Sequence, residues 1–270
     1  MKKNYAEIET IVFLSALMLV MIMSVGATYS YAGTYYVDLG ENVKTTVKWG
    51  GTFDSSAVTY VRIKPSKKGT ITFTADFYCW VTLCDENYKE LSKGYYDSGD
   101  CVDPHNTNSF MQKVHYGVKG NKIYNLKVVN MPQNVGQDNK FYGVLMYTNS
   151  KVKPCKCGAS KKKAKAIKKN KKVKGLFVGG SKKAQWFKVT NKQKKTKITI
   201  SADKINYALN VKVYYKDGKK WKNASTNLTW QTDYKKNTFQ GTISKKAKHT
   251  YYIKVTPEGK TSGAYSIKWK

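Results

Sequence analysis

The side chains most often used in catalysis are scarce in this 270-residue sequence. Its three histidines, His105, His115 and His249, stand far apart along the chain. No GxSxG nucleophile elbow, HExxH zinc motif or Cys–His signature accompanies them. A catalytic triad can also be assembled from distant residues, so an enzyme stays an alternative. From these residues we predict a protein that is not an enzyme.

One acidic loop is the only candidate for a cation site. Asp97, Asp100 and Asp103 crowd together and follow Asp85 and Glu86 along the chain. Carboxylates at this spacing could wrap Ca²⁺, which takes six to eight oxygen ligands, although the spacing does not match an EF-hand. We favour the alternative of a solvated acidic loop, and we expect no other cofactor.

The lysines give the strongest chemical signal. The formal net charge is +32, and residues 1–150 carry 15 basic and 13 acidic side chains, whereas residues 151–270 carry 34 and 4. Arg62 is the only arginine. Lysine acts as a hydrated point charge, so this pattern favours diffuse attraction to an anionic polymer through counterion release. An AT-rich genome and a need for solubility would explain lysine over arginine, but not the difference between the halves.

The N-terminus has the pattern of an export signal. Lys2 and Lys3 precede an uncharged apolar run at residues 11–25, and small residues follow up to Ala32. This order is typical of a secretory signal peptide, and we predict cleavage after Ala32. The alternative is a retained membrane anchor, but the run is short for a span of ~20 residues. We therefore expect a secreted, extracellular protein.

Export makes disulfides available to the five cysteines. Cys84 and Cys101 flank a predicted hairpin and could bridge across strands, while Cys79 is equally available by sequence. Cys155 and Cys157 lie in a Lys-rich stretch and do not have the spacing of two CxxC zinc pairs. The odd number leaves at least one thiol free or paired between chains.

The elements that must position these residues are strands. Period-two alternation recurs throughout the second half, as in residues 251–255 and 265–269, and no long stretch has a helical period. Asp217-Gly218 is a hairpin-turn signal. In this phase four lysines point away from the core and form the predicted polyanion-binding surface: Lys188, Lys212, Lys254 and Lys268. Trp186 has the same outward phase and is a candidate for stacking on a glycan, whereas we expect Trp221 and Trp230 to pack in the core or in turns.

The two halves of the chain repeat one another. Residues 60–63 and 71–76 match residues 186–189 and 198–203, and residues 124–128 match 251–255, with the later segments at a common offset of 127 residues. Matches in the same order predict a duplicated domain. We expect an all-β chain: a signal peptide at 1–32, antiparallel jelly-roll-like β-sandwiches at 33–148 and 167–270, and a Lys-rich linker at 149–166.

Both halves resemble the bacterial pre-peptidase C-terminal domain. The resemblance rests on VKGLFVGGSKKAQWFKVT, KITISAD, NVKVYYKDGKKW and YYIKVTPEGKTSGAYSIKW in the second half. The first half keeps YVRIKPSKKGTITFTAD and GNKIYNLKVV. The resemblance implies β-sandwich modules that accompany secreted hydrolases or surface proteins and are not themselves catalytic.

These observations predict a non-enzymatic binding protein at a bacterial surface. We expect the basic second domain to attach to an anionic cell-wall polymer or polysaccharide, such as the teichoic acids of a Gram-positive wall. The near-neutral first domain would then present another surface, to a glycan or a secreted protein. The alternative is an accessory or interaction module of a secreted hydrolase. We expect no specific nucleic-acid partner and no transmembrane segment in the mature chain.

Overall fold

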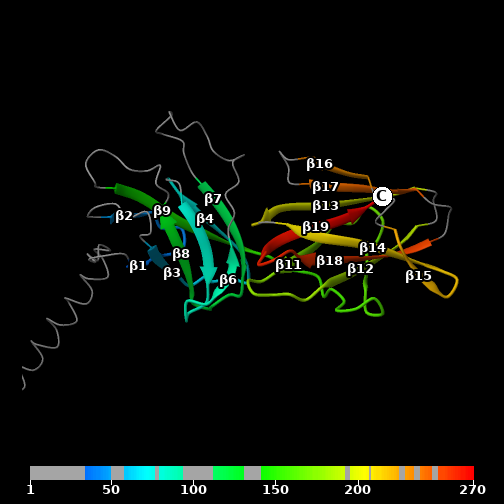
Figure 1. Cartoon of the computed structure of the whole chain (residues 1–270), viewed down its shortest axis with the longest axis horizontal. Coiled ribbons are helices and arrows are strands. Elements are labelled where there is room, and N and C mark those ends of the chain that lie inside the picture. The colour runs from blue at the N-terminus through cyan, green and yellow to red at the C-terminus, as the bar shows by residue number, and fades with distance from the viewer. Residues whose placement is uncertain are drawn as a thin grey trace, which may run out of the picture.

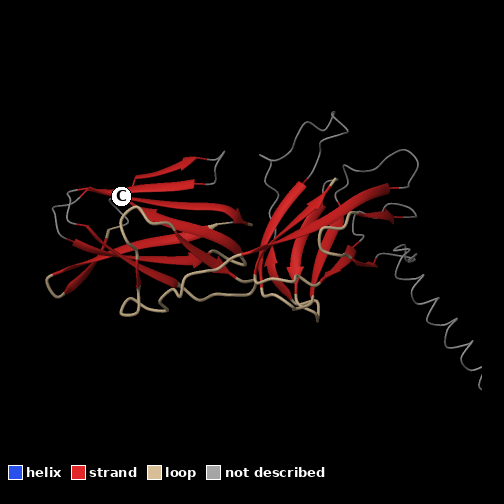
Figure 2. Cartoon of the chain, turned by 180° about the vertical axis from the view of Figure 1, so that it is seen from behind, coloured by secondary structure: helices blue, strands red, loops and turns tan. Residues whose placement is uncertain are grey.

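A computed structural model of the chain describes residues 34–49, 58–76, 79–93, 112–130, 141–191, 195–206, 208–224, 229–233, 238–244 and 249–270. The predicted signal segment, 1–32, lies outside these residues. Strands, turns and loops make up the described part, which contains no helix and therefore none long and apolar enough to cross a membrane. Figures 1 and 2 show two groups of strands lying side by side along the long axis of the molecule.

The first group of strands forms two sheets. One has the order β1 (Thr34–Asp38), β3 (Val58–Ile63), β8 (Tyr124–Asn130), β5 (Cys79–Cys84) and β6 (Glu90–Lys93). The other has the order β2 (Thr45–Trp49), β9 (Phe141–Lys151), β4 (Gly69–Ala75) and β7 (Gln112–Val118). Strands β1 and β3 pair in parallel, and the remaining neighbours pair antiparallel. We call this the first unit.

The second unit repeats this architecture. Its first sheet has the order β10 (Lys165–Ala166), β12 (Gln185–Asn191), β18 (His249–Pro257), β14 (Leu209–Asp217) and β15 (Lys220–Asn223). Its second sheet has the order β11 (Val173–Phe177), β19 (Gly263–Trp269), β13 (Lys195–Ile205), β17 (Thr238–Ser244) and β16 (Thr229–Asp233). The edge pair β10–β12 is parallel, like β1–β3. Apart from β16, which has no counterpart among the described strands of the first unit, the orders match as a duplicated domain predicts. The all-β, two-sandwich fold is confirmed.

Alternating side chains build the two cores. In β3, Val61 and Ile63 are buried while Arg62 between them is exposed. The same alternation in β12 buries Phe187 and Val189. Each fully buried side chain of this size contributes about 1.5–3 kcal/mol relative to an exposed one. The alternate apolar residues that the sequence predicts to face inward are therefore the ones that form the sandwich interior.

The predicted turn between β14 and β15 is present, but one residue further along. Asp217 pairs with Lys220, so the two loop residues are Gly218 and Lys219. Gly218 has a φ of 58°, a left-handed conformation that glycine adopts without steric cost. The side chain of Asp217 forms an ion pair with Lys222 across the hairpin at 2.5 Å.

A hydrogen-bonded junction joins the two units. The Asn206 amide donates to Ser92 Oγ at 2.7 Å and to the Lys93 carbonyl at 2.5 Å, and its Oδ1 accepts from the Ser262 N–H at 2.7 Å. Ser262 Oγ and Ser92 Oγ are 2.8 Å apart. Ser92, Asn206 and Ser262 are buried. We call these three residues the junction network; it leaves the units in direct contact, not only joined by the intervening chain.

Glycine is required where backbones approach each other at this junction. The Gly117 carbonyl accepts from the Gly179 N–H at 2.9 Å, and a Cβ at Gly117 would collide with the Phe177 carbonyl. Gly263 has a φ of 127°, and its missing side chain makes room for the Lys204 carbonyl. Backbone from both units therefore packs closely, as glycine permits.

Candidate functional site

The candidate site lies on the outer face of the sheet that contains β12, β18 and β14. Lys188, Lys212 and Lys254 alternate with the buried residues of these strands, so their side chains share the face that points away from the core. Lys212 pairs directly with Lys254, and Trp186 pairs with Lys254 from the other side. Among the described residues, neither Lys212 nor Lys254 forms an ion pair. The sequence thus places three cations on one sheet face.

Aromatic rings lie beside these lysines on the same sheet. Trp186 and Tyr214 have ring centroids 5.7 Å apart, and Trp221 meets Tyr252 edge to face at 5.0 Å. Lys161 covers them: its Nζ lies 4.2 Å from the centroid of Trp221, 4.6 Å from Tyr214 and 5.9 Å from Trp186. A lysine over aromatic faces at such distances contributes about 0.5–2 kcal/mol. Lys161 therefore fixes part of the chain onto the outer face.

An open pocket of about 540 Å³ adjoins this face. Its walls include Lys168, Lys169 and Lys188, with Ile167 and Trp269 as apolar lining. The indole Nε1 of Trp269 donates to the Ile167 carbonyl at 2.8 Å, which fixes that part of the wall. Three cationic side chains around a hollow can surround a phosphate or carboxylate group. Lys188 belongs both to the pocket and to the outer face, so the two are continuous.

Most of the segment predicted as a linker, 149–166, packs against the second unit, but its first residues, 149–151, end strand β9 of the first unit. The Trp186 N–H donates to the Gly158 carbonyl at 2.9 Å, and Ala164 is buried. A disulfide joins Cys155 and Cys157, and both pack against the core of the second unit. Half of the residues in 151–174 are lysine, and the stretch still packs through its few apolar residues, of which Val152, Ala164 and Ile167 are buried.

Two of the predicted site residues, and also Trp221, have positions that the sequence alone did not give. Lys268 lies in β19, on the other sheet of the sandwich, so it does not join the other three lysines. Trp186 does lie on the outer face, but it is only 8% exposed because Lys161 and Tyr214 cover it. Trp221, expected in core or turn packing, lies in β15 and is 44% exposed. Trp186 is therefore not open to a glycan in this conformation.

The predicted acidic and cysteine sites fall largely outside the described residues. Asp97, Asp100, Asp103 and Cys101 are all outside them, so the calcium site and the Cys84–Cys101 bridge stay predictions. In the described residues, no group of three or more His, Cys, Asp or Glu side chains could hold a metal. Cys84 is buried and its Sγ lies 3.9 Å from the Thr82 carbonyl. Burial, and then the nearby Glu90 carboxylate, raise the pKa of the Cys84 thiol to about 11.

The histidines have structural neighbours. The Nδ1 of His115 lies 2.9 Å from Thr72 Oγ1 on the neighbouring strand, and the ring of His249 packs edge to face against Tyr215. His105 lies outside the described residues. That the protein is not an enzyme stays a prediction.

No protein-family model matches the chain, and no curated protein matches it. Among solved structures, it is similar to the pre-peptidase C-terminal domain of a Bacillus anthracis collagenase, with 11% identity and a TM-score of 0.26 over 45% of this chain and 100% of that one. A candidate secreted protein from Eubacterium rectale matches over 92% of this chain and 81% of its own, with 9% identity and a TM-score of 0.26. The C-terminal domain of the Streptococcus agalactiae AgI/II polypeptide BspA covers 70% of this chain and 76% of its own, with 13% identity and a TM-score of 0.19. A pre-peptidase C-terminal domain is thus among the solved structures to which the chain is similar, and no function or ligand follows from likenesses of this size.

Proposed function

We propose that the second unit attaches this protein to an anionic polymer outside the cell, with a phosphate-rich wall polymer as the ligand class. The supporting observation is the direct pairing of Lys212 with Lys254 on neighbouring strands. Like charges directly opposite each other destabilise a sheet. Lys188 adds a third cation on the same face, and a polyanion would relieve the repulsion among them.

The arrangement suits a flexible polymer better than a small ligand. Lys168 and Lys169 extend the cationic face into the pocket beside Lys188, so successive phosphates could contact successive lysines. Such contacts are electrostatic and carry little sequence or shape information, as expected for lysine point charges. The ligand is held along a surface. Together with the predicted export signal, this supports retention of an exported protein at the bacterial surface.

A pull-down on Gram-positive cell walls tests this function. Purified full-length protein is mixed with walls that keep or lack teichoic acid, at several salt concentrations. We expect retention that needs teichoic acid and is lost as salt rises. The variant K188Q/K212Q/K254Q should bind about 100-fold more weakly near 0.1 M salt, since each lost phosphate contact removes about fivefold.

The matched control variant removes the same number of positive charges from the first unit. Lys44, Lys67 and Lys122 are exposed on the first unit, and K44Q/K67Q/K122Q removes the same three charges. We expect this variant to bind within a few-fold of the wild type. Equal loss in both variants would contradict a defined site and leave only net charge. Wall binding without any dependence on teichoic acid would contradict the proposed ligand.

A further inference from the structure

Three tyrosines form an exposed aromatic surface on the first unit. Tyr36 is 55% and Tyr88 45% exposed, and Tyr60 lies between them. The rings of Tyr36 and Tyr60 are stacked with centroids 5.8 Å apart, and Tyr88 meets Tyr60 edge to face at 4.7 Å. We call these three residues the tyrosine platform. Trp80, 45% exposed, adds another large apolar side chain in β5 of the same sheet. Large apolar side chains gathered on a solvent-facing surface mark binding sites.

Backbone strain holds Tyr88 in place. Its φ is 61°, a left-handed conformation that is rare for a bulky side chain. The turn is fixed because Asp85 Oδ1 accepts from the Lys89 N–H at 2.9 Å, and the Asn125 amide donates to the Asp85 carbonyl at 3.0 Å. Strain that the surrounding structure maintains is concentrated at functional positions. Here it keeps the ring of Tyr88 against Tyr60.

The duplication places the platform at the position of the aromatic site in the second unit. Tyr60 pairs with Lys127 on the neighbouring strand, as Trp186 pairs with Lys254. Both units therefore carry an aromatic ring beside a lysine at the same place on the same outer face. In the second unit Lys161 covers the ring, whereas Tyr36 and Tyr88 of the platform are about half exposed.

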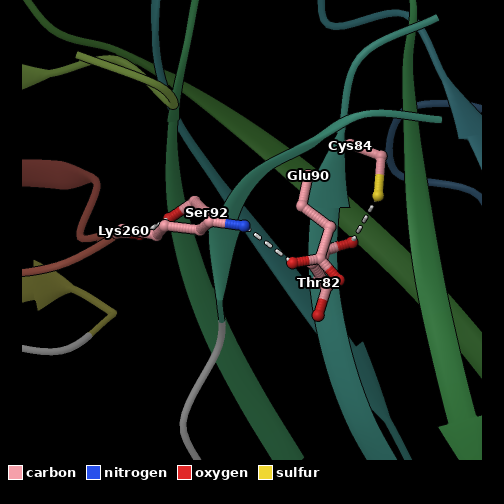
Figure 3. A network of polar contacts seen from close by, with 5 residues as sticks. All are labelled: Thr82, Cys84, Glu90, Ser92 and Lys260. Carbon is pink, nitrogen blue, oxygen red and sulfur yellow. Dashed lines mark hydrogen bonds and ion pairs between the residues drawn. The ribbon is translucent and has the colours of Figure 1, made fainter. Parts of the chain in front are cut away.

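Charged groups of both signs lie near the platform. Lys127 lies on the strand beside Tyr60, and the Glu90 carboxylate binds the ammonium of Lys260 at 2.8 Å. Figure 3 shows Lys260 of the second unit reaching Glu90 of the first. Hydrogen-bonding groups of both signs beside aromatic rings can meet hydroxyl groups, which both donate and accept. Because the Glu90 carboxylate lies here and already pairs with one of the two lysines, these surroundings favour a polyanion less than the outer face of the second unit does.

The size of the platform argues against a protein partner. A stable protein interface buries about 800 Å² on each side. Tyr36, Tyr88 and Trp80 are 55%, 45% and 45% exposed, so at about 150–250 Å² for a whole aromatic side chain they offer only roughly 220–360 Å². Sugar rings fit the smaller area, because one apolar C–H face can stack on a tyrosine while the hydroxyls point to the rim. From this we infer that the tyrosine platform binds an uncharged glycan. The inference concerns the first unit and does not depend on the polyanion site.

Affinity electrophoresis tests this site with four uncharged polysaccharides as probes: starch, β-1,3-glucan, mannan and chitin fragments. A second arm measures solution binding in about 0.5 M NaCl, where screening leaves a Debye length of about 4 Å and suppresses lysine-driven binding. We expect binding to at least one probe. Y36A/Y88A should weaken it by about tenfold or more, since two stacking surfaces are lost, while Y36F/Y88F keeps the rings and most of the affinity.

Trp221→Ala is the matched control, because it removes an exposed aromatic side chain from the second unit. We expect it to leave glycan binding unchanged. Unchanged circular dichroism of Y36A/Y88A shows that a loss of affinity is not unfolding. No binding of the wild type to any of the four probes, or equal binding by Y36A/Y88A, would overturn the inference. Binding of the same preparations to teichoic acid is measured in parallel, so that a loss of glycan binding can be told apart from a loss of polyanion binding.

Discussion

Asn206→Ala should destabilise the protein by breaking the junction network. The Asn206 side chain makes three short hydrogen bonds, to Ser92 Oγ, the Lys93 carbonyl and the Ser262 N–H, and only 7% of the residue is exposed. Alanine cannot replace any of them, and water has little access to the groups left behind. A net hydrogen bond contributes about 1 kcal/mol, and an orphaned buried group costs more. We therefore expect the free energy of unfolding to fall by about 2–4 kcal/mol.

Urea denaturation followed by circular dichroism measures this change. Asn210→Ala is the control, because Asn210 is exposed in β14, the next strand along the chain. Removing its side chain should change the free energy of unfolding by no more than about 0.5 kcal/mol. A double-mutant cycle of Asn206→Ala with Ser92→Ala should give a coupling of about 1 kcal/mol across the junction. Additive effects, or an Asn206→Ala protein as stable as the control, would refute the account of the junction.

Three further predictions concern titration, packing and reactivity. The hydrogen bond from Lys260 lowers the pKa of Glu90, so this pair stabilises the fold above the unfolded pKa of about 4.3, and the stabilisation is lost as pH falls through the folded pKa. Glu90→Gln should therefore lower the free energy of unfolding by about 0.5 kcal/mol at pH 7 and leave it unchanged at pH 2, as measured by urea unfolding. Lys161→Ala should cost about 1 kcal/mol and shift tryptophan fluorescence to the red as Trp186 gains solvent; an unchanged spectrum would contradict the covering role of Lys161. In protein whose Cys84 is reduced, the raised pKa of its thiol, about 11, predicts very slow alkylation at pH 8 in the native state, and labelling as fast as in urea would be inconsistent with it.

Much of the fold could be predicted because each strand has one buried face. Alternation in residues 251–255 identified Tyr251, Ile253 and Val255 as core, and all three are buried. The internal repeat also predicted that both units share one architecture, and the described strand orders match apart from the additional strand β16. Local periodicity is enough for such predictions, because a residue's phase along a strand decides whether it meets the core.

Contacts between distant segments could not be predicted in this way. The outward phase of Trp186 was correct, but its exposure depends on Lys161, which no periodicity brings to the same face. The tyrosine platform depends on the parallel pairing that sets Tyr36 beside Tyr60, and sequence alternation does not specify which strands pair. The close approach of backbones at Gly117 could not be predicted either, because a glycine in a strand indicates a tight contact but not which residue makes it.

The salt dependence of binding to soluble poly(glycerol phosphate) tests the central claim most directly. The full-length protein is titrated at a series of salt concentrations, and the slope of log K against log salt is compared between K188Q/K212Q/K254Q and K44Q/K67Q/K122Q. If Lys188, Lys212 and Lys254 each contact a phosphate, the first variant should reduce the slope by about 2, at about 0.7 per contact, and the second should leave it unchanged. Equal slopes for the two variants would contradict a polyanion site on the outer face of the second unit.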